Sequence, residues 1–469
     1  MSRPHSTARR RHRPGAAIIL GAIVLIAVPG QEAPAAPLFP VPMFETGRSP
    51  VAVLAADFNG DGLPDLAIAN RDSREACIGI LTGRLPGFFA PQVCYPSGQS
   101  LAIVAGDFTG DGLADLAAAN DRTVAVLPGH GDGAFAAPIV APAQFPRRLA
   151  AADFDRDGRL DLVYVSDAVF GGEVPRITLR FGLGDGSFGA TADLLIGRLP
   201  VDVAAGDLDR DGRPDVVIAD SAGDELLVLL GRGDGTFEEG PELEAGEDPG
   251  SVAILDLDGD GHPDIVATGI GSGDVVVHPG RGNGSFGMQR RSPAGASPHR
   301  FAAADFDGDG DLDLAVGSIF DGTLTSLLND GHGAFRIALT IEQRVFDVAA
   351  ADFDRDGTVD LVGTSAGSVA LMRGRGDGTF RQVDRAVTGD RHLSVQAADL
   401  DGDGNDDLIS AAIFEGAVGV LLARGDGTFM EPRLHPPVPS LTWRSPPTSP
   451  WMGLPTWRSS TTPAKVARS

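Results

Sequence analysis

Aspartates recur along this chain in a pattern that suits a divalent cation. A nine-residue segment with acidic side chains at positions one, three, five and nine and glycine at position six occurs eight times. Of its 32 acidic positions 30 are Asp, and the exceptions are Asn59 and Thr109. We number these segments loops one to eight; they span residues 57–65, 107–115, 153–161, 207–215, 256–264, 305–313, 352–360 and 399–407.

Calcium is the cation that this chemistry predicts, because Ca²⁺ takes six to eight oxygen ligands from carboxylates and backbone carbonyls. We assign the side chains at positions one, three, five and nine and the backbone carbonyl at position seven to one ion per loop. The assigned residues are Asp57, Asn59, Asp61, Leu63 and Asp65; Asp107, Thr109, Asp111, Leu113 and Asp115; Asp153, Asp155, Asp157, Arg159 and Asp161; Asp207, Asp209, Asp211, Arg213 and Asp215; Asp256, Asp258, Asp260, His262 and Asp264; Asp305, Asp307, Asp309, Asp311 and Asp313; Asp352, Asp354, Asp356, Thr358 and Asp360; and Asp399, Asp401, Asp403, Asn405 and Asp407.

Two rival readings of the loops are weaker. An EF-hand needs a bidentate Glu at position twelve and flanking helices, whereas position twelve of loop one is Ile68, within an apolar strand pattern. The second alternative is a metal-free turn held by Asp side chains. Four carboxylates so close together would, however, repel one another without a cation. Asn59 and Thr109 remove charge, so loops one and two are expected to bind calcium more weakly than the other six loops.

The spacing of the loops predicts the fold. Their first aspartates are 46 to 54 residues apart, and self-similarity at such a period indicates a solenoid, a propeller or an array. Each unit contains three or four short apolar segments bounded by Gly, Pro and Asp, which is typical of the four strands of a propeller blade. We therefore expect an all-β chain forming a β-propeller of eight four-stranded blades, with residues 38–46 supplying an outer strand that closes the ring. Seven blades with a surplus repeat is the alternative.

A second repeated motif makes the resemblance to a family specific. Turns of the form Gly-Asp-Gly-x-Phe or close variants end at Phe135, Phe188, Phe237 and Phe286 and recur in the later units, and the phenylalanine is expected to pack between neighbouring blades. These units resemble the FG-GAP repeats of integrin α-subunits and the related bacterial VCBS repeats over residues 37–437. The resemblance implies a propeller whose Asp-rich hairpin loops bind calcium. The chain lacks the other domains of an integrin, so no integrin-type receptor role is carried over.

The charge excludes some classes of partner. The formal net charge is −26, with 64 acidic against 38 basic residues, and most of the acidity is concentrated in the loops. Eight bound Ca²⁺ ions would carry sixteen positive charges and bring the net charge to −10. Nucleic acids and anionic membrane surfaces are therefore poor partners.

The N-terminus predicts export. Residues 1–36 combine an arginine-rich start, an apolar run over 16–28 and an Ala-x-Ala cleavage pattern at 33–35, as in a secretory signal peptide. The alternative is a membrane anchor, for which the apolar run is short; no other segment could span a bilayer as a helix. Cys77 and Cys94 are the only cysteines, and in an exported chain a local disulfide between them is expected.

The C-terminal segment, residues 438–469, departs from the repeats. It holds all three tryptophans and the only lysine of the chain, and it is expected to be disordered. Choosing permitted codons for 443–462 and shifting the frame yields a sequence like a ninth repeat, which motivates the hypothesis of a frameshift. The alternative is an ordinary Pro/Ser/Thr-rich tail.

Function is less constrained than fold. The leading hypothesis is a secreted, calcium-stabilised propeller that acts as a binding or adhesion module for a glycan or an extracellular protein. The alternative is a calcium-dependent polysaccharide lyase carried on a propeller. No nucleophile–base pair, zinc-ligand set or phosphate loop stands out, and nearly every repeat is occupied by the structural motifs, so we expect the chain not to be an enzyme.

Overall fold

The computed structural model describes residues 43–45, 50–61, 65–70, 76–84, 88–166, 175–194, 199–318, 320–342, 345, 347–352, 356–365, 368–386, 392–412 and 417–424. The expected export signal, the expected C-terminal tail and two of the assigned ligand residues, Leu63 and Asp354, lie outside these ranges. The chain separates into two compact units, Met1–Arg433 and Leu434–Ser469. All described residues belong to the first.

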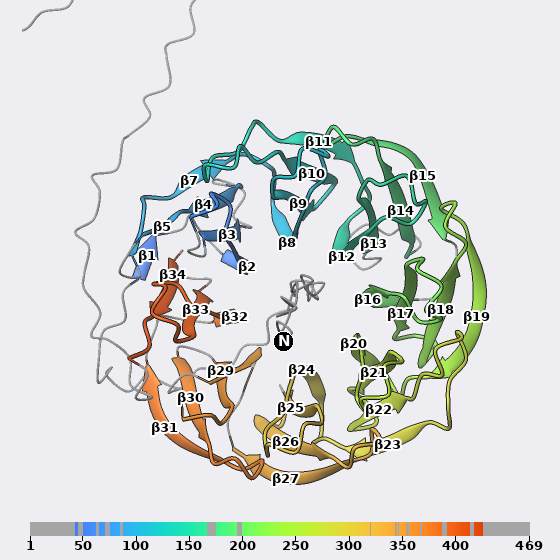
Figure 1. The fold of residues 1–469 in the computed structure, drawn as a ribbon, viewed down its shortest axis with the longest axis vertical. Coiled ribbons are helices and arrows are strands. Elements are labelled where there is room, and N and C mark those ends of the chain that lie inside the picture. The colour runs from blue at the N-terminus through green and yellow to red at the C-terminus, as the bar shows by residue number, and fades with distance from the viewer. Residues whose placement is uncertain are drawn as a thin grey trace, which may run out of the picture. The chain divides into compact units, whose positions relative to one another are not determined.

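Every regular element in the described part of the chain is a β-strand, and the strands form eight four-stranded antiparallel sheets, or blades, arranged around one axis (Figure 1). The first blade contains β2 (Pro50–Ala56), β3 (Asp65–Asn70), β4 (Ile78–Leu81) and β7 (Val93–Tyr95). The short strands β5 (Gly83–Arg84) and β6 (Phe88–Phe89) pair with each other beside it. The second blade contains β8 (Ser100–Gly106), β9 (Asp115–Asn120), β10 (Thr123–Leu127) and β11 (Ile139–Pro142).

The next four blades repeat this order from the axis outward. The third contains β12 (Pro146–Ala152), β13 (Asp161–Ser166), β14 (Ile177–Gly182) and β15 (Phe188–Leu194). The fourth contains β16 (Pro200–Gly206), β17 (Asp215–Asp220), β18 (Glu225–Gly231) and β19 (Phe237–Glu244). The fifth contains β20 (Pro249–Leu255), β21 (Asp264–Gly269), β22 (Asp274–His278) and β23 (Arg290–Pro293). The sixth contains β24 (Pro298–Ala304), β25 (Asp313–Ser318), β26 (Thr323–Asn329) and β27 (Phe335–Ile341).

The last two blades complete the ring. The seventh contains β28 (Val348–Ala351), β29 (Asp360–Ser365), β30 (Ser368–Gly374) and β31 (Phe380–Ala386). The eighth contains β32 (His392–Ala398), β33 (Asp407–Ala412), β34 (Ala417–Leu421) and, as its outer strand, β1 (Met43–Glu45). The strand β1 pairs antiparallel with β34, so that Met43 lies opposite Gly419. The expectation of eight blades closed by an N-terminal outer strand is confirmed over residues 43–45, and the seven-blade alternative is wrong.

Burial is greatest in the second strand of the blade and least in the outer strand. All six residues of β17 are buried, whereas β19, the outer strand of the same blade, is mostly exposed. The inner two or three strands are almost continuously apolar because neighbouring blades pack against both of their faces. At the closure of the ring, Val53 and Ile68 of the first blade pack with Leu400 and Ile409 of the eighth. Closure also removes the free inner edges on which another chain could pair.

The repeated turn phenylalanines link successive blades, as expected. Phe135, in the turn of the second blade, meets Phe58, in loop one, edge to face at 5.3 Å, and Phe237 meets Phe154 in the same way at 5.8 Å. The turn glycine Gly235 donates its N–H to the Phe154 carbonyl at 3.2 Å. Gly235 has φ +76°, and a Cβ there would lie 2.2 Å from the ring of Phe181, so this contact requires glycine.

Two further observations concern the cysteines and membrane-spanning helices. Cys77 and Cys94 form a disulfide that joins the residue before β4 to β7 in the first blade. Within the described residues no helix is long and apolar enough to cross a membrane.

Candidate metal-binding loops

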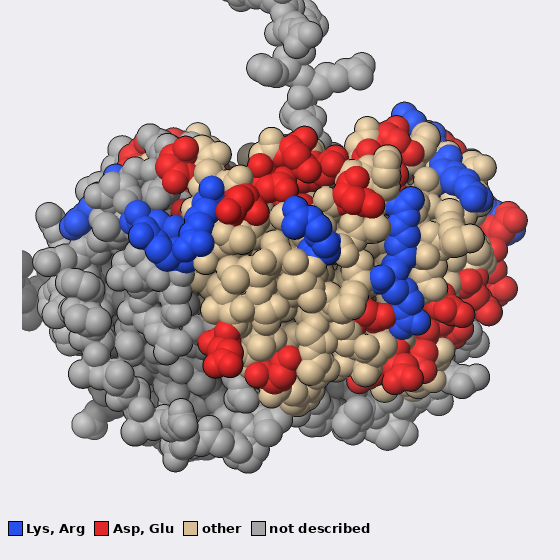
Figure 2. Space-filling view, turned by 90° about the horizontal axis from the view of Figure 1, so that it is seen from below, with Lys and Arg blue, Asp and Glu red and all other residues tan. Residues whose placement is uncertain are grey.

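Each Asp-rich loop connects the innermost strand of a blade to the second strand. Position one directly follows the inner strand, as Asp207 follows β16, and position nine is the first residue of the second strand, as Asp215 begins β17. Because all eight inner strands run the same way along the axis, the loops gather at one end of the ring. In the side view of Figure 2 acidic side chains gather along the upper edge, and further groups lie along the lower edge.

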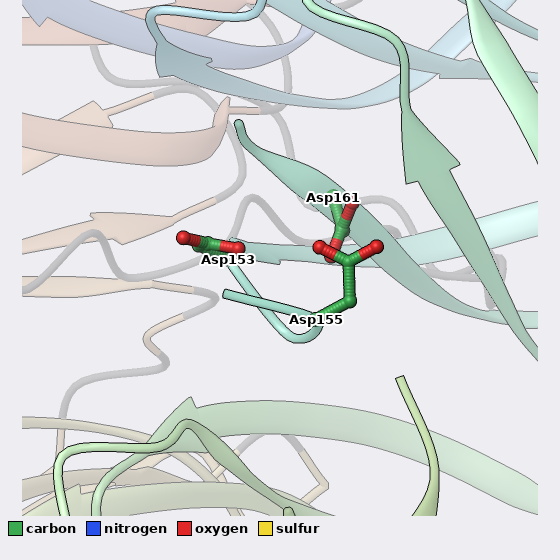
Figure 3. Close-up of side chains that lie close together, drawn as sticks. All are labelled: Asp153, Asp155 and Asp161. Carbon is green, nitrogen blue, oxygen red and sulfur yellow. The ribbon is translucent and has the colours of Figure 1, made fainter. Parts of the chain in front are cut away.

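In five loops three carboxylates come together. The carboxylates at positions one, three and nine bring oxygens within 4.8 Å of one another in loops three, four, six and eight, and those at positions one, three and five do so in loop five. Figure 3 shows Asp153, Asp155 and Asp161 facing one another from the end of β12, the loop and the start of β13. A separation of this size allows all three groups to bind one Ca²⁺ ion at about 2.3–2.6 Å.

The aspartate at position nine also anchors the backbone. In loop four Asp215 is fully buried. Its Oδ2 accepts the N–H of Leu208 at 2.7 Å, and its Oδ1 accepts the N–H of Gly231, at the end of the third strand, at 2.7 Å. The same pair of bonds recurs on Asp65, Asp115, Asp161, Asp264, Asp313 and Asp407. Position nine therefore has a structural role that our sequence analysis missed.

Burial perturbs the acidity of these anchors. Removal from water is the main cause that raises the pKa of Asp161 and Asp215 to about 6, and the neighbouring loop aspartates raise it further. The pKa of Asp407 rises to about 8 for the same reasons. The N–H donors oppose this shift. A buried carboxylate surrounded by like charges is an environment that a cation would stabilise.

Positions one, three and five also hold the loop in shape. Asp153 accepts the N–H groups of Asp157 and Gly158 at 3.1 and 2.9 Å, and Asp155 accepts that of Asp157 at 3.1 Å. Such bonds are typical of Asp turns with or without metal. The loop is thus formed by its own acidic side chains before any ion is considered.

Position five turns toward position seven in several loops. Asp157 contacts the Arg159 guanidinium at 3.1 Å, Asp211 pairs with Arg213, and Asp403 accepts the Asn405 amide at 2.6 Å. In these loops the carboxylates at positions one, three and nine of the predicted set come together. The side chain at position five lies outside this group and contacts position seven. The predicted carbonyl ligands at position seven stay a prediction.

Unsatisfied oxygens give an independent test of fit to a cation. Asp307 at position three of loop six and Asp399 at position one of loop eight each have a buried Oδ1 without a hydrogen-bond donor among the described residues. Asp352 Oδ1 in loop seven is in the same state. A buried carboxylate oxygen without a donor is costly, and a metal ion removes that cost. The residues present therefore fit Ca²⁺.

Loops one and two differ from the others. In loop one the Asn59 amide donates to Asp65 at 3.4 Å, and in loop two the Thr109 N–H donates to Asp115 at 2.8 Å. Within the described residues neither loop brings three carboxylates together. The expected weaker affinity of these loops stays a prediction, and its physical basis is the missing third charge.

A recess of about 230 Å³ opens at the loop end between the third and fourth blades. Ala152, Gly206, Asp207 and Arg213 contribute to its wall. Arg213 is held there by a hydrogen bond of 2.8 Å from its Nε to the Gly231 carbonyl. Asp207, at position one of loop four, thus forms part of the wall of the recess.

Comparison with solved structures finds similar chains at low sequence identity. A lectin from Agrocybe aegerita, described as specific for non-reducing terminal N-acetylglucosamine, is 19% identical with a TM-score of 0.44, over 72% of this chain and 94% of its own. A protein from Lactobacillus plantarum is 17% identical with a TM-score of 0.43, over 71% of this chain and 97% of its own. A protein from Desulfotomaculum acetoxidans is 10% identical with a TM-score of 0.45, over 73% of this chain and 97% of its own. Such similarity says nothing about ligands.

Sequence comparison is more specific. None of the curated proteins matches this chain. The FG-GAP-like repeat family matches residues 86–164, 207–267, 256–316 and 352–410, and the FG-GAP repeat matches residues 49–75. These matches cover more than half of the chain and coincide with the blades and their Asp-rich loops. The chain belongs to the family of FG-GAP repeat proteins.

Proposed function

We propose that this protein is an exported calcium-binding propeller that serves as a binding module for a glycan or an extracellular protein. The convergence of three carboxylates in loops three, four, five, six and eight carries the calcium part of the proposal. The buried Oδ1 atoms of Asp307 and Asp399 support it, because they meet no hydrogen-bond donor among the described residues. A nearby cation would offset the cost of burying them. One ion per loop would rigidify the end of the ring that carries the loops.

The partner is proposed to approach this loop end. Calcium fixes the loops, and the recess beside Asp207 and Arg213 offers a concave wall next to one ion site. Hydroxyl and carboxylate oxygens of a glycan, or side-chain oxygens of a protein, are ligands that a partly hydrated Ca²⁺ ion accepts. The proposed role is recognition without turnover, and the proposed place is outside the cell.

Calcium binding is tested first, by isothermal titration of the purified, metal-stripped chain. We expect at least five sites with Kd on the order of 10⁻⁴–10⁻³ M, as in extracellular calcium modules. The double variant Asp153→Ala/Asp155→Ala should lose one site. The matched control Asp132→Ala, in a turn outside the loops, should lose none. An unchanged number of sites in the double variant would contradict the assignment.

Partner recognition is tested by a glycan array and by polysaccharide turnover, each with calcium and with chelator. Calcium-dependent binding without turnover supports a binding module. Release of unsaturated oligosaccharides would instead favour the lyase alternative and overturn the recognition part of the proposal. Export is tested separately by N-terminal sequencing of protein recovered from the culture medium, where cleavage after Ala35 or Ala36 is expected.

A further inference from the structure

One layer of residues on the innermost strands or directly before them, away from the metal loops, includes charged or polar side chains at Arg148, Asp202, Ser251, Arg300 and Asp347. It consists of the residues five positions before each loop, at the same register position of successive blades, and we call it the axial layer. Its members are Ala52, Ala102, Arg148, Asp202, Ser251, Arg300, Asp347 and Ser394. In Figure 1 the innermost strands β8, β12, β16, β20 and β24 are seen around the axis. The loops repeat one sequence, whereas this layer changes from blade to blade.

Local strand geometry places these side chains. As in the blades of Ala52 and Ala102, the register between the first two strands shifts just before Arg148, Asp202, Ser251 and Arg300, as in a β-bulge. Bulges redirect the side chain that follows them and are common beside functional sites. All four residues are at most 7% exposed.

Contacts within the layer run from blade to blade. Asp202 lies 3.5 Å from Arg148 and 3.7 Å from Arg300, measured between carboxylate oxygen and guanidinium nitrogen. The Ser251 hydroxyl donates to Asp202 at 3.1 Å, and Arg300 Nη1 donates to that hydroxyl at 3.3 Å. The charges of Arg148 and Arg300, three blades apart, also act on each other. Both guanidinium groups therefore lie beside the same Asp202 carboxylate.

The acids of the layer are engaged with backbone. Asp202 Oδ2 also accepts the Val252 N–H at 3.2 Å, and Asp347 Oδ2 accepts the Val395 N–H at 3.1 Å. Each carboxylate thus ties its own blade to the next one. Asp202 thus shares its oxygens between the Val252 N–H, the Ser251 hydroxyl and the two nearby guanidinium groups.

Arg300 is left with unused donors. Its Nε and Nη2 are buried and meet no acceptor among the described residues, and Nε2 of the adjacent His299 is in the same state. Burial, and then the like charge of Arg148, lower the pKa of Arg300 to about 9. A buried guanidinium with open N–H groups is unfavourable unless an acceptor completes it. Asp202 and Asp347 oppose this lowering of the pKa, so Arg300 Nε and Nη2 lack a hydrogen-bond acceptor rather than a neutralising charge.

We propose that the axial layer binds a carboxylate group, held by Arg300 Nε and Nη2 on the propeller axis. Nε and one Nη of a guanidinium form a planar fork that matches the two oxygens of a carboxylate. The layer lies five residues along the inner strand from the Asp-rich loops, or roughly 16 Å at about 3.3 Å per residue. The carboxylate site is therefore separate from the calcium sites and does not depend on the proposed function.

Calorimetric titration of the purified, calcium-loaded chain at low chloride tests the site. The probes are acetate, galacturonate and the neutral sugar galactose. We expect saturable one-to-one binding of acetate and none of galactose. Binding of galacturonate as well would show that the site admits a carboxylate borne on a sugar, whereas binding of acetate alone would restrict it to small acids. Absence of saturable binding by both acids would overturn the proposal.

Variants separate the site from general effects of charge. Arg300→Lys keeps the positive charge and removes the fork, and should weaken acetate binding at least about tenfold, as expected for lost hydrogen bonds to a charged group. Arg300→Met should abolish it, provided the melting curve shows a folded chain. The matched control Arg291→Gln removes a half-exposed arginine of the rim that pairs with Asp274 and should bind acetate unchanged. Equal affinity in Arg300→Lys and the unaltered chain would contradict the assignment even if Arg300→Met fails to fold.

Discussion

The two ends of the eight inner strands differ in how much their residues vary from blade to blade. At one end every blade carries nearly the same loop, and the position-nine aspartates of loops one to six and loop eight make the same two backbone bonds. Five residues earlier along those strands, the axial layer holds Ala, Arg, Asp or Ser according to the blade. Repetition at the loop end stabilises each blade alike, whereas variation in the axial layer breaks the symmetry of the ring. A single site on the axis needs such variation, since eight equal arginines would repel one another.

Chelation is expected to have the largest effect, because it acts on many loops at once. At a calcium concentration ten times Kd each ion adds about 1.4 kcal/mol to the free energy of unfolding. The five loops with converging carboxylates would then contribute about 7 kcal/mol, and their loss should lower Tm by about 8 °C for a chain of this length. Scanning calorimetry with chelator measures this, and re-addition of calcium is the control. An unchanged melting curve after verified metal removal would contradict metal stabilisation at the loop end.

The anchoring role of position nine can be separated from metal binding in the metal-free protein. Asp215→Ala leaves the buried N–H groups of Leu208 and Gly231 without an acceptor, and should lower the free energy of unfolding by about 3 kcal/mol. Asp211→Ala, in the same loop, removes a partly exposed pair with Arg213 and should cost less than about 1 kcal/mol. Urea denaturation in chelator measures both. Similar losses in the two variants would show that position nine is no more than a ligand.

The difference between loop two and the complete loops can be removed by one substitution. Thr109→Asp restores the third carboxylate beside Asp107 and Asp115 and should add one calcium site with Kd on the order of 10⁻⁴–10⁻³ M. Titration calorimetry against the unaltered chain counts the sites. Thr109→Asn, which adds an oxygen without charge, is the matched control and should add no site of that affinity. A gain of equal size in both variants would show that charge is not what loop two lacks.

The smallest effect concerns pH at the axial layer. Burial is the main cause that raises the pKa of Asp347 to about 6, against the opposing effects of the Val395 N–H, Arg300 and Arg148. Because its folded pKa is raised, Asp347 gains a proton and loses its negative charge as pH falls through about 6. Asp202 faces the same arginines and keeps its contacts with Ser251 and Val252. Acetate should therefore bind several-fold more tightly at pH 5.5 than at pH 7.5.

Asp347→Asn provides the control for this pH dependence. The amide carries no charge at either pH, so the variant should bind acetate with nearly the same affinity at both. Calorimetric titration at the two pH values makes the comparison. A pH dependence that persists in Asp347→Asn would assign it to another group and leave the carboxylate site itself to the Arg300 variants.

Much of the architecture was predictable because it depends on short-range patterns. The period of the loops predicts the blades, the glycine-rich turn ending at Phe135 predicts packing between blades, and residues 38–46 predict the closing strand observed at β1. The convergence of Asp153 and Asp155 follows from a nine-residue loop alone, since alternate residues of a tight turn face inward. Each of these statements concerns residues that are neighbours in sequence or in a repeated motif.

Other features were decided only by the tertiary structure. The double hydrogen bond on Asp215 depends on where the third strand brings Gly231, sixteen residues away. The contact between Asp211 and Arg213 depends on the hydrogen bond that holds the Arg213 side chain against the Gly231 carbonyl. The axial layer depends on the closure of eight blades, because Arg148 and Arg300 are separated by three repeats and meet only when ring size and register place both at the axis. The sequence by itself thus determined the blade and its loop, and the closed ring determined which of the varying residues share one buried site.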